Sequence, residues 1–123
     1  MPFGYKILNR QKVEGYCGYT GEWGSFNVFV ENRIANQVYR YDEWTKRKDG
    51  FGPLALFETR VQAENYICTG FNRHNKRIVE CEYTRSVDNA LWTINEYGYI
   101  DTLKYLPPGT ILADKIKVLE ILD

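Results

Sequence analysis

The feature that most constrains the fold is residues 49–67, which join a turn, a short apolar run and a helix signature. Gly52 and Pro53 mark the turn, because glycine adopts backbone angles that other residues avoid and proline fixes φ. The apolar run that follows, residues 54–57, has the length of a buried strand. The sequence therefore predicts a strand that leads directly into a helix.

The helix is predicted over about residues 59–69. Thr59 and Gln62 have the spacing of a capping box, in which the two side chains satisfy backbone N–H groups at the helix start. Gly70 is a typical C-terminal stop. The apolar positions recur at helical spacing and give the helix one apolar face, made of Ala63, Tyr66 and Ile67. Such a helix needs a sheet to pack against.

Alternating segments elsewhere predict that sheet, because side chains of a strand point to opposite faces in turn. The clearest is residues 78–83, in which Val79, Cys81 and Tyr83 share one side. Residues 15–24 are expected to form a flexible loop or an irregular hairpin, and residues 119–122 could be strand or helix. Further strands are expected at residues 4–8, 26–30, 37–42, 90–94 and 115–118.

Most gaps between these segments are too short for a helical crossover, which favours antiparallel pairing. The predicted fold class is therefore α+β and β-rich. It consists of a twisted, mostly antiparallel sheet with one main helix, at about residues 59–69, packed on it.

Composition places the chain among folded proteins. With 123 residues, 44% of them hydrophobic and 15% aromatic, it is predicted to form a single domain over residues 1–123. The net charge is zero, so a basic field that would gather duplex nucleic acid is not expected. The three cysteines are odd in number and no signal peptide is evident, which favours reduced thiols and a cytoplasmic location. No apolar run reaches the ~20 residues of a membrane helix.

No metal or cofactor site is expected. Cys17, Cys68, Cys81 and His74 lack the spacing of metal ligands. The glycine-rich phosphate-binding motifs and the nucleophile elbow are missing from the sequence. A nucleophilic pair of Cys17 with His74 stays a minor alternative, because such partners meet in space rather than in sequence.

Two carboxylates offer a candidate catalytic pair. Glu80 and Glu82 should lie on one face of a strand, about 7 Å apart. Paired carboxylates at that spacing can share acid–base work. The same pattern is typical of a solvent-facing strand, where Arg40 or Lys117 of neighbouring strands would pair with them.

Two basic segments, each beside an aromatic residue, are the strongest polar features. A cation next to an aromatic ring can hold a phosphate while the ring stacks on a base. A run of like charges is also typical of a solvated loop. The candidate ligand-binding residues are Trp44, Lys46, Arg47, Phe71, Arg73, His74, Lys76 and Arg77.

Two further segments resemble a family of small phage and mobile-element proteins. They are residues 52–59, which read GPLALFET and are followed by Ala63, and residues 106–119, which read LPPGTILADKIKVL. That family couples a GPL…F-T strand–helix unit to a closing LPPGT…AD…K segment. Together with residues 78–83, the resemblance covers roughly the second half of the chain. It implies a phage origin, and hence the cytoplasm of a host cell, but says little about activity.

The strand–helix unit followed by an acidic strand also resembles the ADP-ribosyltransferase fold, in which a Glu-x-Glu pair carries catalysis. That resemblance implies that Glu82 is the catalytic residue. The chain departs from the pattern, because no Ser-Thr-Ser strand precedes the helix and His74, the single histidine, follows it. The chain also resembles the Thoeris anti-defence proteins, which capture nucleotide immune signals, in its size, its aromatic content and its implied phage origin.

The function expected from the sequence is that of a non-enzymatic small binding protein that recognises a nucleotide-like anionic ligand or a host protein. One alternative is an ADP-ribosyltransferase-like or nuclease-like enzyme that uses Glu80 and Glu82. Another is a protein–protein inhibitor of a host defence system. Association into a homo-oligomer is left open.

Overall fold

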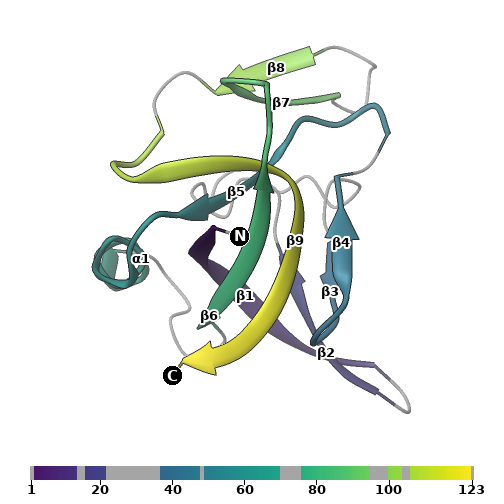
Figure 1. The fold of residues 1–123 in the computed structure, drawn as a ribbon, viewed down its shortest axis with the longest axis vertical. Coiled ribbons are helices and arrows are strands. Elements are labelled where there is room, and N and C mark those ends of the chain that lie inside the picture. The colour runs from purple at the N-terminus through teal and green to yellow at the C-terminus, as the bar shows by residue number, and fades with distance from the viewer. Residues whose placement is uncertain are drawn as a thin grey trace.

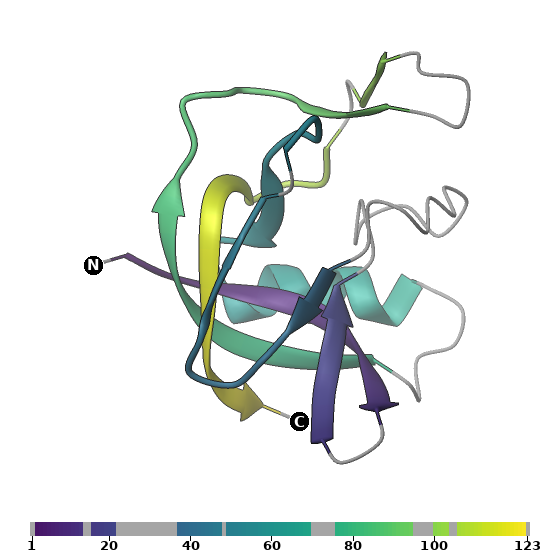
Figure 2. The same cartoon turned by 90° about the vertical axis from the view of Figure 1, so that its right-hand side faces the viewer.

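A computed structural model describes residues 2–13, 16–21, 37–47, 49–69, 76–94, 100–103 and 106–122 (Figures 1 and 2). The predicted fold class is confirmed, since a twisted antiparallel sheet carries one helix. In chain order the elements are β1 (Phe3–Val13), β2 (Tyr16–Gly21), β3 (Gln37–Tyr39), β4 (Trp44–Lys46), β5 (Leu54–Phe57), α1 (Arg60–Thr69), β6 (Lys76–Arg85), β7 (Leu91–Ile94), β8 (Ile100–Leu103) and β9 (Thr110–Leu122).

The three long strands β1, β6 and β9 organise the main sheet. β6 lies between β1 and β9 and is antiparallel to both. β5 pairs with β9 and, at a single position, with β1, so β1, β6, β9 and β5 form a closed circuit of paired strands. β2 and β3 extend the sheet from β1, and β4 pairs with β9. Figure 1 shows β6 and β9 curving together across the front of the molecule.

The main core lies inside this curved sheet. Val79, Cys81 and Tyr83 of β6 are buried there, as their alternation predicts, while Glu80 and Glu82 face outward. The other strands add buried side chains to the same cluster, namely Leu8, Tyr39, Leu56, Ile111, Ala113, Ile116 and Val118. Alternation along the long strands therefore divides an apolar interior from an outer face that carries charged side chains and, under α1, a second apolar cluster.

Helix α1 covers one part of the outer face. Ala63 and Ile67 are buried against Ile7, Phe57 and Ile78. The capping box is confirmed, because the Thr59 backbone N–H donates to Gln62 Oε1 at 3.1 Å and the Gln62 N–H donates to Thr59 Oγ1 at 3.3 Å. These bonds satisfy two of the N–H groups that lack a partner at a helix start.

The β7–β8 hairpin forms a separate two-stranded sheet at one end of the molecule (Figure 1). It is fastened to the turn before β5, where the Gly52 N–H donates to the Trp92 carbonyl at 3.0 Å. A Cβ atom at Gly52 would lie 2.6 Å from that oxygen, so only glycine allows this approach. Leu91 is buried against Ala55 beside it.

The two segments whose structure the sequence left undecided, residues 15–24 and 119–122, both contain strand. Residues 16–21, within the predicted loop or hairpin, form β2, which pairs with β1. Residues 119–122 continue β9 as strand. The strand expected at residues 26–30 lies outside the described residues. Among the residues that are described, no helix is long and apolar enough to cross a membrane.

Candidate functional site

The candidate site is built by the pairing of β4 with β9. Trp44 lies opposite Lys117, and Lys46 lies opposite Lys115. Thr45, between them on β4, lies opposite the buried Ile116. Because cross-strand partners point to the same face, the indole and the lysines share the outer face. We call the four residues Trp44, Lys46, Lys115 and Lys117 the β4–β9 patch.

Two lysine ammonium groups lie close to one indole in this patch. Lys115 Nζ is 4.6 Å from the centroid of the Trp44 ring, and Lys117 Nζ is 5.6 Å from it. Each contact is within the range of a cation–π interaction, worth about 0.5–1 kcal/mol at an exposed site. Lys46 lies directly opposite Lys115, and like charges at such positions destabilise a sheet. The patch therefore concentrates positive charge around an aromatic ring.

Acidic groups border the patch on the side of Lys117. Asp42 Oδ1 is 3.8 Å from Lys117 Nζ, although 69% of the Asp42 side chain is exposed, so this ion pair is weak. Glu82 lies opposite Lys117 on the other edge of β9. Lys117 thus has acidic neighbours on both sides, whereas the cross-strand pair of Lys46 and Lys115 is purely basic.

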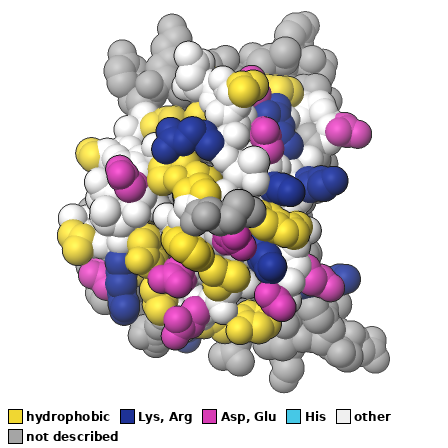
Figure 3. Space-filling view, viewed as in Figure 1, with side chains coloured by type: hydrophobic (Ala, Val, Ile, Leu, Met, Phe, Trp, Pro, Cys, Tyr) yellow, Lys and Arg dark blue, Asp and Glu magenta, His cyan; other side chains and the backbone are white. Residues whose placement is uncertain are grey.

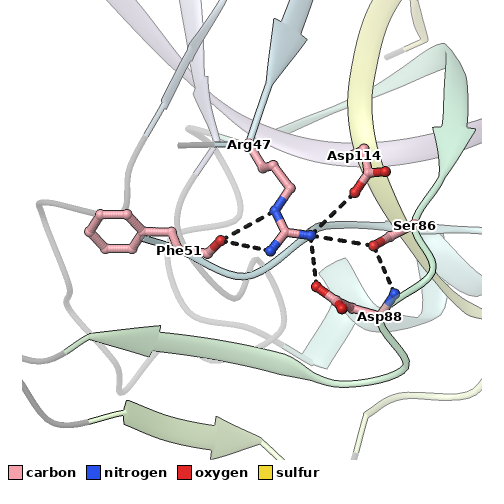
Figure 4. Close-up of polar contacts among 5 residues, drawn as sticks. All are labelled: Arg47, Phe51, Ser86, Asp88 and Asp114. Atoms are coloured by element: carbon pink, nitrogen blue, oxygen red, sulfur yellow. Dashed lines mark hydrogen bonds and ion pairs between the residues drawn. The ribbon is translucent and has the colours of Figure 1, made fainter. Parts of the chain in front are cut away.

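Arg47, a predicted ligand-binding residue, bonds instead to acceptors of the chain itself (Figure 4). Its guanidinium lies 5.7 Å from the centroid of the Trp92 ring. Its hydrogen-bond acceptors are the Phe51 carbonyl, at 3.0 and 3.3 Å, Asp88 Oδ2 at 2.7 Å, Asp114 Oδ1 at 3.2 Å and Ser86 Oγ at 3.4 Å. In this arrangement Arg47 fastens the end of β4 to three other segments.

The second predicted basic segment lies away from the patch. Lys76 and Arg77 begin β6, whereas Lys115 lies opposite Thr84 near the end of that strand. The eight strand positions between Lys76 and Thr84 span roughly 26 Å. The structure therefore does not bring these two residues together with Lys46. Phe71, Arg73 and His74 lie outside the described residues.

The carboxylate pair lies where the alternation of β6 predicts. Glu80 and Glu82 are both half-buried on the outer face. Glu82 lies opposite Lys117, and Glu80 lies opposite Glu120. Glu82 therefore has the basic cross-strand neighbour expected of a structural pair, and it lies next to the β4–β9 patch.

An ionisable cluster inside the sheet was not foreseen from the sequence. Lys6 is only 2% exposed, and its Nζ donates to the Ala55 carbonyl at 2.6 Å and lies 5.5 Å from the centroid of the Tyr39 ring. Burial lowers the pKa of Lys6 to about 8, and the nearby Cys81 thiol opposes that shift. Burial also raises the pKa of Cys81 to about 12 and raises the pKa of Tyr39. Lys6 and Leu8 are two positions apart in a strand, so their side chains point to the same face. This spacing was the signal that could have placed Lys6 inside.

Lys115 and Lys117 were also missed as site residues. The alternation of residues 115–118 predicts both lysines on one face, but the sequence alone does not show that β4 lies beside them. In the described part of the chain, no group of three His, Cys, Asp or Glu side chains is arranged to hold a metal ion.

Comparisons with protein-family models, with curated proteins and with solved structures found no significant match. The resemblances to phage, ADP-ribosyltransferase and anti-defence proteins therefore stay predictions, and the interpretation of the site depends on its geometry.

Proposed function

We propose that the chain is a non-enzymatic binding protein whose β4–β9 patch holds an anionic ligand with a planar group, such as a nucleotide. The observation that carries this proposal is the approach of two ammonium groups, from Lys115 and Lys117, to within 4.6 and 5.6 Å of the same indole centroid. A phosphate would accept charge-assisted hydrogen bonds from these lysines. A base would stack on Trp44, because aromatic rings accept the face of any base.

The like charges of the patch support the same proposal. Lys46 lies opposite Lys115, so two ammonium groups come from neighbouring strands on the outer face. An anion bound there would be attracted by both.

The Arg47 network has a positioning role in this proposal. Arg47 directly follows β4, and its backbone N–H donates to the Asp114 carbonyl at 2.9 Å. Its side chain bonds to the carboxylate of the same residue. Asp114 directly precedes Lys115, so these contacts fix the register that brings Trp44 and the lysines together.

Calorimetric titration with mono-, di- and cyclic nucleotides tests the proposal. We expect Trp44→Ala to weaken binding by about 1–3 kcal/mol through lost stacking. We expect Lys115→Gln to weaken it by about 1.5–3 kcal/mol, because a charged hydrogen bond is lost. Binding should also weaken as salt rises, since charges are screened over ~10 Å at 0.1 M salt.

Arg77→Gln is the matched control, because Arg77 is a basic residue of the same sheet at the far end of β6. It should leave nucleotide affinity unchanged. A loss of affinity from Arg77→Gln with none from Lys115→Gln would place the ligand on the second basic segment instead. If no nucleotide binds below millimolar concentration, the proposal fails, and capture of a host protein becomes the function to test.

The place of Glu82 beside the patch favours one second candidate, an enzyme of ADP-ribosyltransferase-like or nuclease-like type. Its test is incubation of the purified chain with NAD, RNA and cyclic nucleotides. Turnover that Glu82→Gln abolishes without lowering the melting temperature would replace the binding-protein proposal. We expect no turnover by the unaltered chain.

A further inference from the structure

The outer face of β9 and its neighbours separates charges of opposite sign. At one end Lys46 lies opposite Lys115, and at the other end Glu120 lies opposite Glu80. We call these the basic pair and the acidic pair. Along β6 their rows, at Thr84 and Glu80, are four positions apart, which corresponds to roughly 13 Å. Figure 3 shows basic, acidic and hydrophobic side chains on the side of the molecule that carries β6 and β9.

A mixed row lies between the two pairs. Lys117 lies opposite Glu82, and Glu82 lies opposite Phe3 on the next strand. The Phe3 residue is 56% exposed, so its apolar side chain is available for contact on this face. The face thus has a centre that mixes acidic, basic and aromatic side chains, flanked by one pair of each sign.

Each flanking pair places two side chains of like charge directly opposite each other on neighbouring strands. Two such pairs of opposite sign on one face are complementary to the same face turned by half a rotation. In a two-fold dimer the same surface of both subunits meets, so every contact between two different residues occurs twice. The basic pair of each copy would then meet the acidic pair of the other.

We propose that this face binds a second copy of the chain in a two-fold dimer, with Phe3 at the centre and the basic and acidic pairs meeting at both ends. The occupant follows from charge complementarity, since the face carries both halves of each contact. Helix α1 limits the interface, because it covers the outer face around Ile7 and Ile78. This inference goes beyond the proposed function and does not depend on it.

Sedimentation equilibrium of two charge-reversal variants tests the dimer. One variant carries Lys46→Glu and Lys115→Glu, and the other carries Glu80→Lys and Glu120→Lys. The unaltered chain should sediment as a dimer at low salt and dissociate as salt rises. Each variant alone should be a monomer, because both ends of its face then have the same sign. An equimolar mixture of the two variants should dimerise again, because each contact regains opposite charges.

The proposal is overturned if the unaltered chain is a monomer at 100 µM and low salt, if either variant still dimerises, or if the mixture stays monomeric. Circular dichroism confirms that the variants fold. Should a reversal prevent folding, the neutral changes Lys115→Gln and Glu80→Gln replace it, and each should weaken dimerisation of the chain at least several-fold.

Nucleotide titration of the Glu80→Lys, Glu120→Lys variant separates this proposal from the function. That variant keeps the whole β4–β9 patch, so it should bind nucleotides as a monomer. A dimer without nucleotide binding would refute the proposed function alone, whereas nucleotide binding by a chain that never dimerises would refute the dimer alone.

Discussion

Replacement of the buried Lys6 by methionine should stabilise the fold at neutral pH and change how stability depends on pH. Burial lowers the pKa of Lys6 from 10.5 to about 8. Since one pKa unit corresponds to 1.36 kcal/mol, the folded state at pH 7 carries a cost of about 3 kcal/mol for this protonated amine. Methionine has a similar length and no charge, so it removes that cost.

Part of this gain is offset by a lost hydrogen bond. Lys6 Nζ donates to the Ala55 carbonyl at 2.6 Å, and methionine would leave this acceptor without that donor. An unsatisfied buried acceptor costs about 1–3 kcal/mol. The net change at pH 7 is therefore small and favourable, about 0–2 kcal/mol. The pH dependence is the more decisive quantity. A neutral Lys6 amine still donates its hydrogen bond to the Ala55 carbonyl, so a change of pH alters only the cost of burying the charge.

The pKa of Lys6 is lower in the folded state than in the unfolded state, so the unfolded state binds more protons between pH 8 and 10.5. The cost is fully present below pH 8 and disappears as the pH rises toward 10.5. The unfolding free energy of the unaltered chain should therefore rise by about 2–3 kcal/mol relative to Lys6→Met between pH 7 and 10. Cys81 and Tyr39, whose pKa values burial raises, act in the opposite direction in both proteins, so they enter this difference only through the coupling of Lys6 to Cys81.

Urea unfolding followed by circular dichroism at several pH values measures this difference. Val61→Met is the matched control, because the Val61 residue is 62% exposed and carries no ionisable group, so its replacement should give a difference that does not change with pH. A flat profile for Lys6→Met, or a profile that falls as pH rises, would refute the reasoning that the cost arises from burial of the ammonium group.

Two further predictions concern packing. Ile67→Ala should lower the unfolding free energy by about 2–4 kcal/mol, because it leaves a cavity under the buried face of α1. Glu64→Ala should cost no more than about 0.5 kcal/mol, since it removes one exposed ion pair with Arg60. Equal costs in urea unfolding would contradict the assigned helix face. Gly52→Ala should lower the unfolding free energy by about 1–3 kcal/mol, because the new Cβ would clash with the Trp92 carbonyl. The backbone amides of β7 should then exchange hydrogen faster. Unchanged exchange in β7 would contradict the contact between Gly52 and Trp92.

The helix and the cleanest strand could be predicted because local signals and tertiary packing agree there. Thr59 and Gln62 form their capping box, and the apolar positions of residues 78–83 are buried in alternation. Residues 119–122 were ambiguous, because a short apolar run suits either a helix or a strand. Pairing with β6 decides in favour of a strand.

The candidate site was only partly predictable, because its members meet through pairing between distant segments. Trp44 and Lys46 were recognised by their proximity in sequence, yet their basic partners Lys115 and Lys117 come from the end of the chain. Arg47 was expected to face a ligand, and its side chain bonds to acceptors up to 67 positions away. Composition and spacing carry no information about such long-range partners.

The same lysines serve both proposals, which gives a consequence that neither has alone. Lys115 would hold a phosphate in the ligand complex and would face Glu80 or Glu120 of a second copy in the dimer. A phosphate on Lys115 would repel the carboxylate that the second copy brings to the same ammonium group, so a ligand that binds the monomer more tightly shifts the chain away from the dimer by mass action. Saturating nucleotide should therefore lower the dimer fraction of the unaltered chain in sedimentation equilibrium, and raising the protein concentration should weaken apparent nucleotide affinity. If nucleotide binds and leaves a dimer intact, the two contacts do not share Lys115.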